Sequence, residues 1–533
     1  MDALAGIDLR STAQREQADP RQVPNNAGGW TFEVTPEIRL RRFLTLGTDG
    51  GTYYVGPRGI TRENAAIVVD FAQRRTEDLV RIVVEISVSG RAPRQNQALF
   101  ALAAAASLGD AEGRRAALDA LPLVARTGTH LFLFARYIEQ FRGWGRGLRR
   151  AVANWYTAKP IDEIAYQAVK YRQREGWSHR DLLRLAHPAT TEDERKRLFD
   201  WICGREPGLD GLRLVEGFQR ATTADPAAVP ELVREYRLSW EMLPDVALSL
   251  PEVWEALLDN GLPQTALLRQ LPRLTSLGLL EPLGTRTRAV AEQLADPERL
   301  RRGRVHPMNV LVALRTYASG HGARGGGAWA PSRPIVDALD AAFYAAFEAV
   351  EPTGKRFLLA LDVSGSMTAR ISGLPLSARE ASAALALVTS ATEPHCETVG
   401  FTAATDATGW REAALTPLPI SPRQRLDDAI RAVSNLPFRG TDCSLPMRYA
   451  LDCALEVDVF VVLTDNETWA GTEHPHQALQ RYREQIAPGA KLVVIGMTAT
   501  GFTIADPADA GMLDIAGFDA AVPALLADFA RGI

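Results

Sequence analysis

The residues best suited to chemistry follow an apolar run in the C-terminal third of the chain. The segment FLLALDVSGSM ends in Asp362, Ser364 and Ser366, spaced two apart. Two later segments carry similar donors: Thr441 in RGTDCS and Asp465 in LTDNETW. Carboxylates and hydroxyls without His or Cys are ligands of hard cations and suit Mg²⁺. We therefore expect a site for Mg²⁺ or another divalent hard cation.

Two other interpretations of DVSGSM remain open. A capped turn after a strand explains this segment by itself, although not its agreement with the two later segments. A serine nucleophile is disfavoured because VSGSM is not a G-x-S-x-G elbow and no histidine is clearly placed as a base. His395, His474 and His476 are most simply surface histidines. We expect no enzyme activity.

A second chemically informative region is basic and aromatic. Between residues 136 and 174 there are nine Lys or Arg against three acids, with Trp and Tyr interleaved. Arg146, Arg149 and Arg150 have the spacing of one helical face, and Lys170 and Arg174 are again four apart. Such a surface suits phosphate contact with occasional base stacking.

The alternative for this region is a solvated helix face with ordinary core aromatics. Composition does not separate the two interpretations. Trp155 and Tyr166 fit a core better than a stacking surface, and His187, just before Pro188, fits a helix cap.

Composition bounds the class of protein that carries these residues. The chain has 533 residues, which predicts two or more domains, and its net charge of −4 neither suggests nor excludes a nucleic-acid partner. Its four cysteines fit no zinc pattern, so we expect a reduced, cytoplasmic protein. The run ALFALAAAASLG is too short to span a bilayer and predicts a buried helix, so we expect no membrane association.

The order of elements predicts two architectures. The first twenty or so residues are polar and are expected to be loosely attached. Helices of ten to fifteen residues with short Pro and Gly breaks then recur to about residue 300, as in irregular paired helices of the HEAT kind. A Gly-rich linker follows at 319–334.

The C-terminal part alternates short apolar runs with helical segments. This order predicts a mostly parallel, doubly covered sheet with Asp362 and Asp465 at the same rim. The predicted strands are 356–362, 396–402, 457–465 and 491–497, and the predicted helices are 377–392, 422–434, 444–454, 475–486 and 519–530.

Longer motifs resemble a known family. RGWGRGLRRAVANWY, KYRQREGWSHRDLLRLAHP, RLRRFLTLGTDGGTYY and HPMNVLVALRTYASGHG are similar to the TROVE module of the Ro autoantigen family. The three cation-site segments resemble the metal-ion-dependent adhesion site of von Willebrand factor A domains. The chain resembles a bacterial-type Ro ribonucleoprotein, with a TROVE module over 25–355 and an A domain over 356–533.

The resemblance implies a multidomain fold: an all-α ring of HEAT-like helical repeats closed by an α/β, doubly wound, Rossmann-like A domain. It implies Y-type small RNA on the outer basic surface and single-stranded 3′ ends of misfolded or immature RNA in a central hole. Lys170, Arg174 and His187 match the family's Y RNA-binding residues.

Other sites and partners follow from the resemblance or extend it. Arg172 and Arg150 are added by charge and helical spacing, and Arg39, Arg41 and Arg42 are candidates for the hole. In the A domain, Ser364, Ser366 and Thr441 would be hydroxyl ligands, and Asp362 and Asp465 would bind directly or through water. We expect a monomer that serves RNA quality control, maturation or decay, with a 3′-to-5′ exoribonuclease partner and no DNA partner. The alternative is a metal-dependent protein-interaction scaffold without a direct RNA role.

Overall fold

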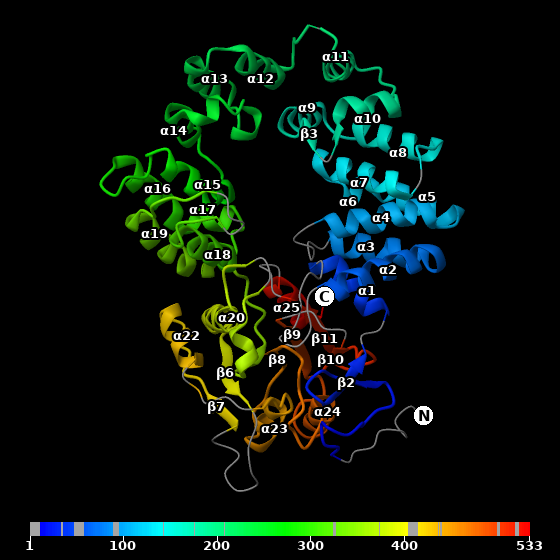
Figure 1. Cartoon of the computed structure of the whole chain (residues 1–533), viewed down its shortest axis with the longest axis vertical. Coiled ribbons are helices and arrows are strands. Elements are labelled where there is room, and N and C mark those ends of the chain that lie inside the picture. Colours follow the sequence, from blue (N-terminus) through cyan, green and yellow to red (C-terminus); the bar gives the residue numbers. More distant parts are fainter. Residues whose placement is uncertain are drawn as a thin grey trace. The chain divides into compact units, whose positions relative to one another are not determined.

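The computed structural model contains two compact units (Figure 1). One unit comprises Met1–Asn64, Ala295–Gly326 and Leu339–Ile533, and the other comprises Ala65–Leu294 and Gly327–Ala338. The structure describes residues 11–33, 36–46, 58–88, 95–141, 143–174, 176–206, 208–322, 327–371, 374–402, 414–434, 436, 440–497, 502–517 and 522–532. Within these ranges no helix combines the length and apolar character needed to cross a bilayer.

The unit centred on residues 65–294 is a succession of short packed helices, as the sequence predicts. Its helices are α2 (Arg58–Arg74), α3 (Thr76–Val88), α4 (Asn96–Leu108), α5 (Ala111–Asp119), α6 (Leu121–Val124), α7 (Gly128–Phe141), α8 (Arg146–Thr157), α9 (Ile161–Lys170), α10 (His179–Ala186), α11 (Asp193–Ile202), α12 (Arg213–Thr223), α13 (Val229–Tyr236), α14 (Pro251–Asp259), α15 (Gln264–Ser276) and α16 (Thr285–Ala295). The Ala-rich α4 is buried and packs against α3, α5 and α7, because small side chains permit close approach on several sides.

One interruption differs from the predicted helical pattern. Strands β3 (Gln173–Arg174) and β4 (Trp177–Ser178) form an antiparallel hairpin between α9 and α10, with Gly176 at φ +83° in the turn. Helix α9 ends at Lys170, so Lys170 and Arg174 do not share a helical face. The helical spacing inferred for this pair is wrong, because the chain leaves the helix between them.

The C-terminal part of the other unit is a doubly wound α/β domain. Its sheet has the order β11-β9-β8-β5-β6-β7, parallel except for the β6–β7 pair. The strands are β5 (Arg356–Asp362), β6 (His395–Phe401), β7 (Leu415–Pro417), β8 (Val459–Thr464), β9 (Lys491–Gly496) and β11 (Met512–Ala516). The four predicted strands are confirmed, whereas the short edge strands β7 and β11 were not predicted.

Helices accompany this sheet at the predicted positions. They are α20 (Ala378–Thr392), α22 (Leu426–Ser434), α23 (Leu445–Asp452), α24 (Pro475–Gln485) and α25 (Val522–Arg531), and the same unit holds α1 (Pro36–Leu46), α17 (Pro297–Arg302) and α18 (Pro307–Ala318), with α19 (Arg333–Ala345) crossing its boundary. Strand β8 is buried along its whole length, as expected of a central parallel strand. Strands β5 and β8 are neighbours, so their carboxyl ends lie at the same rim.

The N-terminal segment from residue 11 is not loosely attached. Strand β2 (Trp30–Glu33) pairs with both β1 (Gln22–Pro24) and β10 (Phe502–Thr503), forming a small antiparallel sheet. Gln14 is 0% exposed. The expectation of a loose tail is wrong for these residues, because polar side chains there satisfy buried hydrogen-bonding groups of the C-terminal domain.

Candidate functional site

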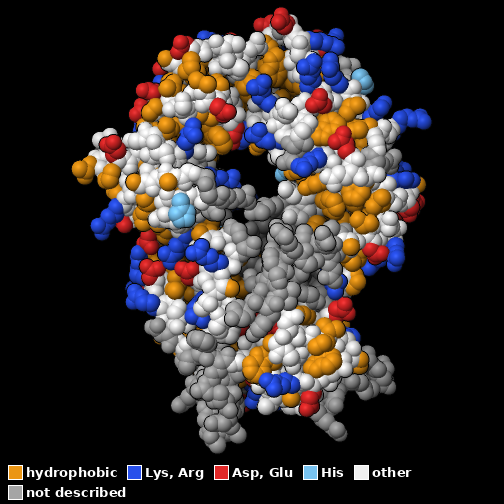
Figure 2. Space-filling model, in the orientation of Figure 1, with side chains coloured by type: hydrophobic (Ala, Val, Ile, Leu, Met, Phe, Trp, Pro, Cys, Tyr) orange, Lys and Arg blue, Asp and Glu red, His pale blue; other side chains and the backbone are white. Residues whose placement is uncertain are grey.

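A basic groove of about 890 Å³ lies in the helical unit, beside the β3–β4 hairpin. Figure 2 shows Lys and Arg side chains gathered over the part of the surface formed by α9 to α12. The groove brings together three predicted residues with several that were not predicted. Its lining includes Lys170, Arg172, Gln173, Arg174, Ser178, His179, Arg180, Trp201, Phe218, Gln219 and Glu241.

Lys170 is the most constrained cation of this groove. Its Nζ donates to the Tyr166 hydroxyl at 2.9 Å and lies 3.3 Å from the Glu241 carboxylate. It also lies 5.1 Å and 5.4 Å from the ring centroids of Tyr166 and Tyr171. Burial lowers the pKa of Lys170, but the tyrosine hydrogen bond and Glu241 outweigh it, and the net pKa is raised. Lys170 is therefore a fixed positive charge.

The hairpin supplies the other two predicted cations. The Arg172 guanidinium lies 4.9 Å from the centroid of the Phe218 ring, so the ring restricts its plane. Arg174 is exposed, and its Nη1 donates to the Gln173 carbonyl at 3.0 Å. A held ammonium, a stacked guanidinium and an exposed one present donors that suit phosphate oxygens.

The remaining predicted RNA-binding residues lie elsewhere. His187 is exposed and ends α10 at φ 47°, and it does not line the groove. Arg150 belongs to α8 and lines a different pocket. Arg42 lies on α1, and its side chain is outside the described residues. The neighbouring Arg39 and Arg41 lie 3.3 Å from Glu33 and Glu37 respectively.

The division of the aromatic residues between the core and the groove differs from the prediction. Trp155 is fully buried, as expected, and its indole donates to the Ala125 carbonyl at 2.5 Å. Tyr166 is 38% exposed, so its assignment to the core is wrong; it covers Lys170 instead. Trp201 and Phe218 were missed because they are distant in sequence from the basic segment. Their helical spacing is that of ordinary core residues, which gave no signal.

A buried histidine supports the floor of the groove. His179 is 2% exposed, shares a 2.6 Å hydrogen bond with the Tyr156 hydroxyl, and packs edge-on against Phe132. Burial lowers the pKa of His179 to about 4. The side chain is therefore neutral at pH 7 and serves packing at the base of the hairpin.

A cluster of carboxylates and hydroxyls lies at the rim of the C-terminal sheet. Asp362, at the end of β5, accepts from the Ser364 amide at 2.8 Å and from the Thr464 hydroxyl at 2.9 Å. The Ser364 and Ser366 hydroxyls are 2.9 Å apart. Asp465 directly follows β8 and accepts from the Glu467 amide at 3.2 Å.

Electrostatics within this cluster favour a bound cation. Burial and the neighbouring Asp465 raise the pKa of Asp362, and burial raises that of Asp465. The Asp465 Oδ2 atom is buried and has no hydrogen-bond partner among the described residues. A hard cation would satisfy that oxygen and offset the repulsion between the two carboxylates.

Hydroxyl groups form a large part of this donor set. The backbone of Thr441 lies beside the Asp465 loop, since its carbonyl accepts from the Trp469 and Ala470 amides at 3.1 Å. No group of three or more His, Cys, Asp or Glu within the described ranges could hold a metal ion. A cation at this rim would therefore depend on hydroxyls and water as well as on the two carboxylates.

The N-terminal segment holds the loop that carries Asp465. The Gln14 side chain donates to Asp442 at 2.7 Å and to the Glu473 carbonyl at 2.8 Å, and accepts from the Thr468 hydroxyl at 2.6 Å. At Gly29 a Cβ would lie 2.0 Å from the Thr468 carbonyl, so this close approach requires glycine.

His474 belongs to the same contact. It is 1% exposed, and its ring nitrogens lie 3.1 Å from Gln22 Nε2 and 2.9 Å from the Glu16 carbonyl. The prediction of a surface histidine is therefore wrong for His474, because the N-terminal segment covers it. His395 is exposed at the start of β6, as predicted.

Comparisons with known proteins agree with this two-part architecture. The model of the Ro60 vWA domain matches residues 356–530, and that of the TROVE domain matches residues 23–205 and 235–316. The chain is 43% identical to the RNA-binding protein RO60 of Deinococcus radiodurans over 99% of each chain. It is 36% identical to the RNA-binding protein RO60 of Caenorhabditis elegans, over 98% of this chain and 92% of the other. The crystal structure of the Deinococcus radiodurans RO (RSR) protein matches with a TM-score of 0.77 and 43% identity, covering 93% of this chain and 100% of that one.

Proposed function

Because the chain belongs to the Ro60 family, which joins a TROVE domain to a Ro60 vWA domain, we propose that it is a non-catalytic RNA-binding scaffold. The relatives are named RNA-binding proteins. The observation that carries the proposal is the groove in which Lys170, Arg172 and Arg174 converge beside Trp201 and Phe218. Cations there would contact phosphates, and the partly exposed Trp201 ring would offer a surface for a base.

The RNA we propose for this groove is a Y-type small RNA, recognised mainly by the shape and phosphates of its duplex. His187 would extend the contact beyond the groove, at the end of α10. Single-stranded 3′ ends of misfolded or immature RNA would enter a central hole, for which Arg39, Arg41 and Arg42 are candidates. The scaffold would present such RNA to a 3′-to-5′ exoribonuclease for quality control, maturation or decay.

The carboxylate–hydroxyl cluster would hold Mg²⁺ or another divalent hard cation. Its ligands would be Asp362, Ser364, Ser366, Thr441 and Asp465, directly or through water. The unpartnered Asp465 Oδ2 supports this assignment. When bound, the cation would supply an open coordination position for a carboxylate of a protein partner. The chain's own residues would fix the position and charge of that site.

The RNA assignment is tested by replacing Lys170, Arg174 and His187 together with Ala. We expect the variant to lose binding of a Y-type RNA in a gel-shift titration while keeping the thermal unfolding curve of the unmodified protein. A control variant carries Arg269→Ala, Arg288→Ala and Arg302→Ala, which remove three exposed cations elsewhere. Unchanged affinity in the first variant would contradict the assignment, as would equal losses in both variants.

The alternative, a metal-dependent protein-interaction scaffold, is supported by the buried free oxygen of Asp465. Asp362→Ala separates the two functions. We expect this variant to keep RNA affinity and to lose a protein that copurifies with the unmodified chain. Loss of RNA binding alone would contradict this division of functions between the two domains.

A further inference from the structure

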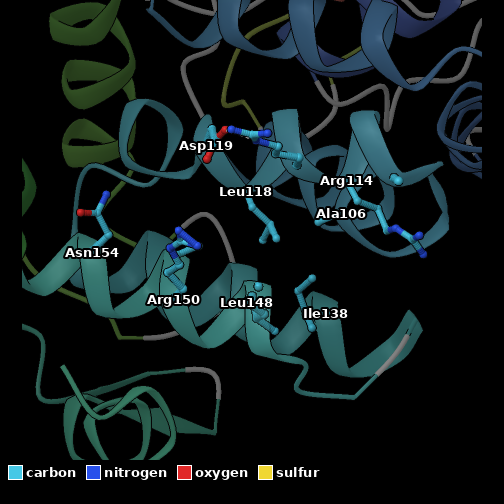
Figure 3. Close-up of a pocket in the computed structure, with 12 residues that line it drawn as sticks. Ala106, Arg114, Leu118, Asp119, Ile138, Leu148, Arg150 and Asn154 are labelled. Atoms are coloured by element: carbon cyan, nitrogen blue, oxygen red, sulfur yellow. Dashed lines mark ion pairs between the residues drawn. The ribbon is translucent and has the colours of Figure 1, made fainter. Parts of the chain in front are cut away.

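A second pocket lies in the helical unit, between α5 and α8 (Figure 3). Its volume is about 900 Å³, and it shares no lining residue with the groove around Lys170. Ala106 of α4 and Ile138 of α7 contribute to its floor. The pocket therefore needs its own explanation.

The charges around this pocket are mostly uncompensated. Among the described residues three arginines line it, Arg114, Arg115 and Arg150, and Asp119 is the one acidic lining residue. Asp119 lies 3.7 Å from Arg115, and both side chains are exposed, so this pair contributes little. Arg114 and Arg150 have no carboxylate partner among the described residues. In Figure 3 they project from α5 and α8 respectively, at the edges of the pocket.

The floor between these cations is apolar. Leu118 and Leu148 face each other across the space between the two helices (Figure 3), and Leu148 is 5% exposed. A Cβ at Gly147 would lie 3.2 Å from Leu118 Cδ1, so glycine lets α8 approach α5 closely. Asn154, exposed one turn further along α8, offers an amide that can both donate and accept.

We propose that this pocket binds one unpaired nucleotide of RNA. The two phosphates that flank the nucleotide would contact Arg114 and Arg150, which lie on opposite sides of the leucines (Figure 3), and the base would cover the floor formed by Leu118, Leu148 and Ile138. Guanidinium groups match phosphate oxygens in geometry and charge, and an apolar floor stabilises a base that has left its stack. The pocket is partly open to solvent, and the space between α5 and α8 has room for a base that has left its stack but not for a duplex. The inference rests on the proposed RNA-binding function and adds to it a site selective for single strands.

The test compares two RNAs that share one duplex, one of them with an unpaired tail of eight nucleotides. We expect the tail to increase affinity for the unmodified protein. The expected increase is about tenfold. Arg114→Ala with Arg150→Ala should remove most of it and should change the affinity for the blunt duplex less than twofold. Arg269→Ala with Arg288→Ala is the control, since both residues lie exposed on the helical unit and line neither pocket.

A second measurement locates the contact. Thiouridine placed in the tail should cross-link to peptides of α5 and α8 in the unmodified protein, and Arg114→Lys with Arg150→Lys should retain more of the tail's effect than the Ala pair. An equal loss for both RNAs would overturn the inference in favour of diffuse attraction. No loss of the tail's effect in the Ala pair would also overturn it. So would a tail that does not cross-link to α5 or α8 and that a poly-glutamate peptide displaces, because any basic surface could hold such a tail. If the unmodified protein binds neither RNA, the proposed function itself fails.

Discussion

At the scale of single residues, neighbours decide how each cation of the groove can act. Lys170 is held by Tyr166 and faces Glu241, whereas Arg174 is exposed. A phosphate approaching Lys170 must compete with the Glu241 carboxylate. A phosphate approaching Arg174 meets no such competitor among the described residues. The two cations therefore contribute differently to binding although they carry the same charge.

Replacing Glu241 with Gln should strengthen RNA binding. The substitution removes the competing carboxylate and leaves Lys170 held by Tyr166, so we expect two- to fivefold higher affinity, or about 0.5–1 kcal/mol. A gel-shift titration at low salt measures it. Glu231→Gln removes one carboxylate from an ion pair with Arg234 outside the groove, and serves as the control for the loss of one negative charge. Equal effects of both substitutions would indicate net charge alone.

His179 should make the stability of the helical unit depend on pH. Its pKa is about 4 in the folded protein and about 6.5 when unfolded, so the unfolded chain binds more protons between these values. Stability therefore falls as the pH falls through this window, by about 1.4 kcal/mol for this side chain between pH 7.5 and 5.5. Urea unfolding at both pH values should show a smaller drop for His179→Gln. The exposed control, His395→Gln, should keep the full drop, and an equal drop in all three proteins would contradict the assignment.

At the scale of elements, the N-terminal segment is a structural part of the C-terminal domain. Its strand β2 joins β10, and Gln14 bonds to three separate groups around the Asp465 loop. These contacts give hydrogen-bond partners to buried polar groups that water does not reach. The loop that carries Asp465 thus depends on residues that precede it by more than four hundred positions.

Gln14→Ala should destabilise the unit that contains the C-terminal domain. It removes buried hydrogen bonds to Asp442, Thr468 and the Glu473 carbonyl, which costs about 2–4 kcal/mol. Thermal unfolding should show an earlier transition. Gln17→Ala makes the same change at an exposed position of the same segment and should cost less than about 0.5 kcal/mol. Identical curves for the unmodified protein and Gln14→Ala would contradict the role given to this side chain.

Local patterns were enough to predict most elements, and distant contacts were not. The apolar runs 356–362 and 457–465 predicted strands with Asp362 and Asp465 at the same rim, and the structure pairs these strands directly. The hairpin at 173–178 was missed because helical spacing continued across it. The burial of Gln14 and His474 could not be predicted, since polar residues become buried only through partners far along the chain.

At the scale of the whole molecule, charge is distributed unevenly. The chain has a net charge of −4, yet the groove is lined by Lys170, Arg172, Arg174 and Arg180, and Glu241 is the one acidic residue among its described lining. Overall charge therefore says little about an RNA partner, and local surface charge says more. Binding driven by such a surface releases counterions and weakens as salt increases.

Salt dependence should separate phosphate contacts from stacking. Arg174→Ala should lower affinity and reduce the slope of log affinity against log salt by about 0.9, the value for one duplex phosphate contact. Phe218→Leu removes the ring beneath Arg172 and should lower affinity with the slope unchanged. Titrations between about 50 and 300 mM KCl measure both the affinity and its salt slope. Equal slopes for Arg174→Ala and the unmodified protein would exclude a direct phosphate contact.

The contact between Gln14 and Asp442 also has a consequence for biosynthesis. The two residues are 428 positions apart, so ribosomes working at about 5–20 residues per second complete the partner roughly 20–90 s after Gln14 is made. Helices in residues 65–294 find their partners within that interval, because their contacts are local. The N-terminal segment lacks its partner on the nascent chain until Asp442 has been synthesised. A segment that is translated late therefore completes the folding of one that is translated early.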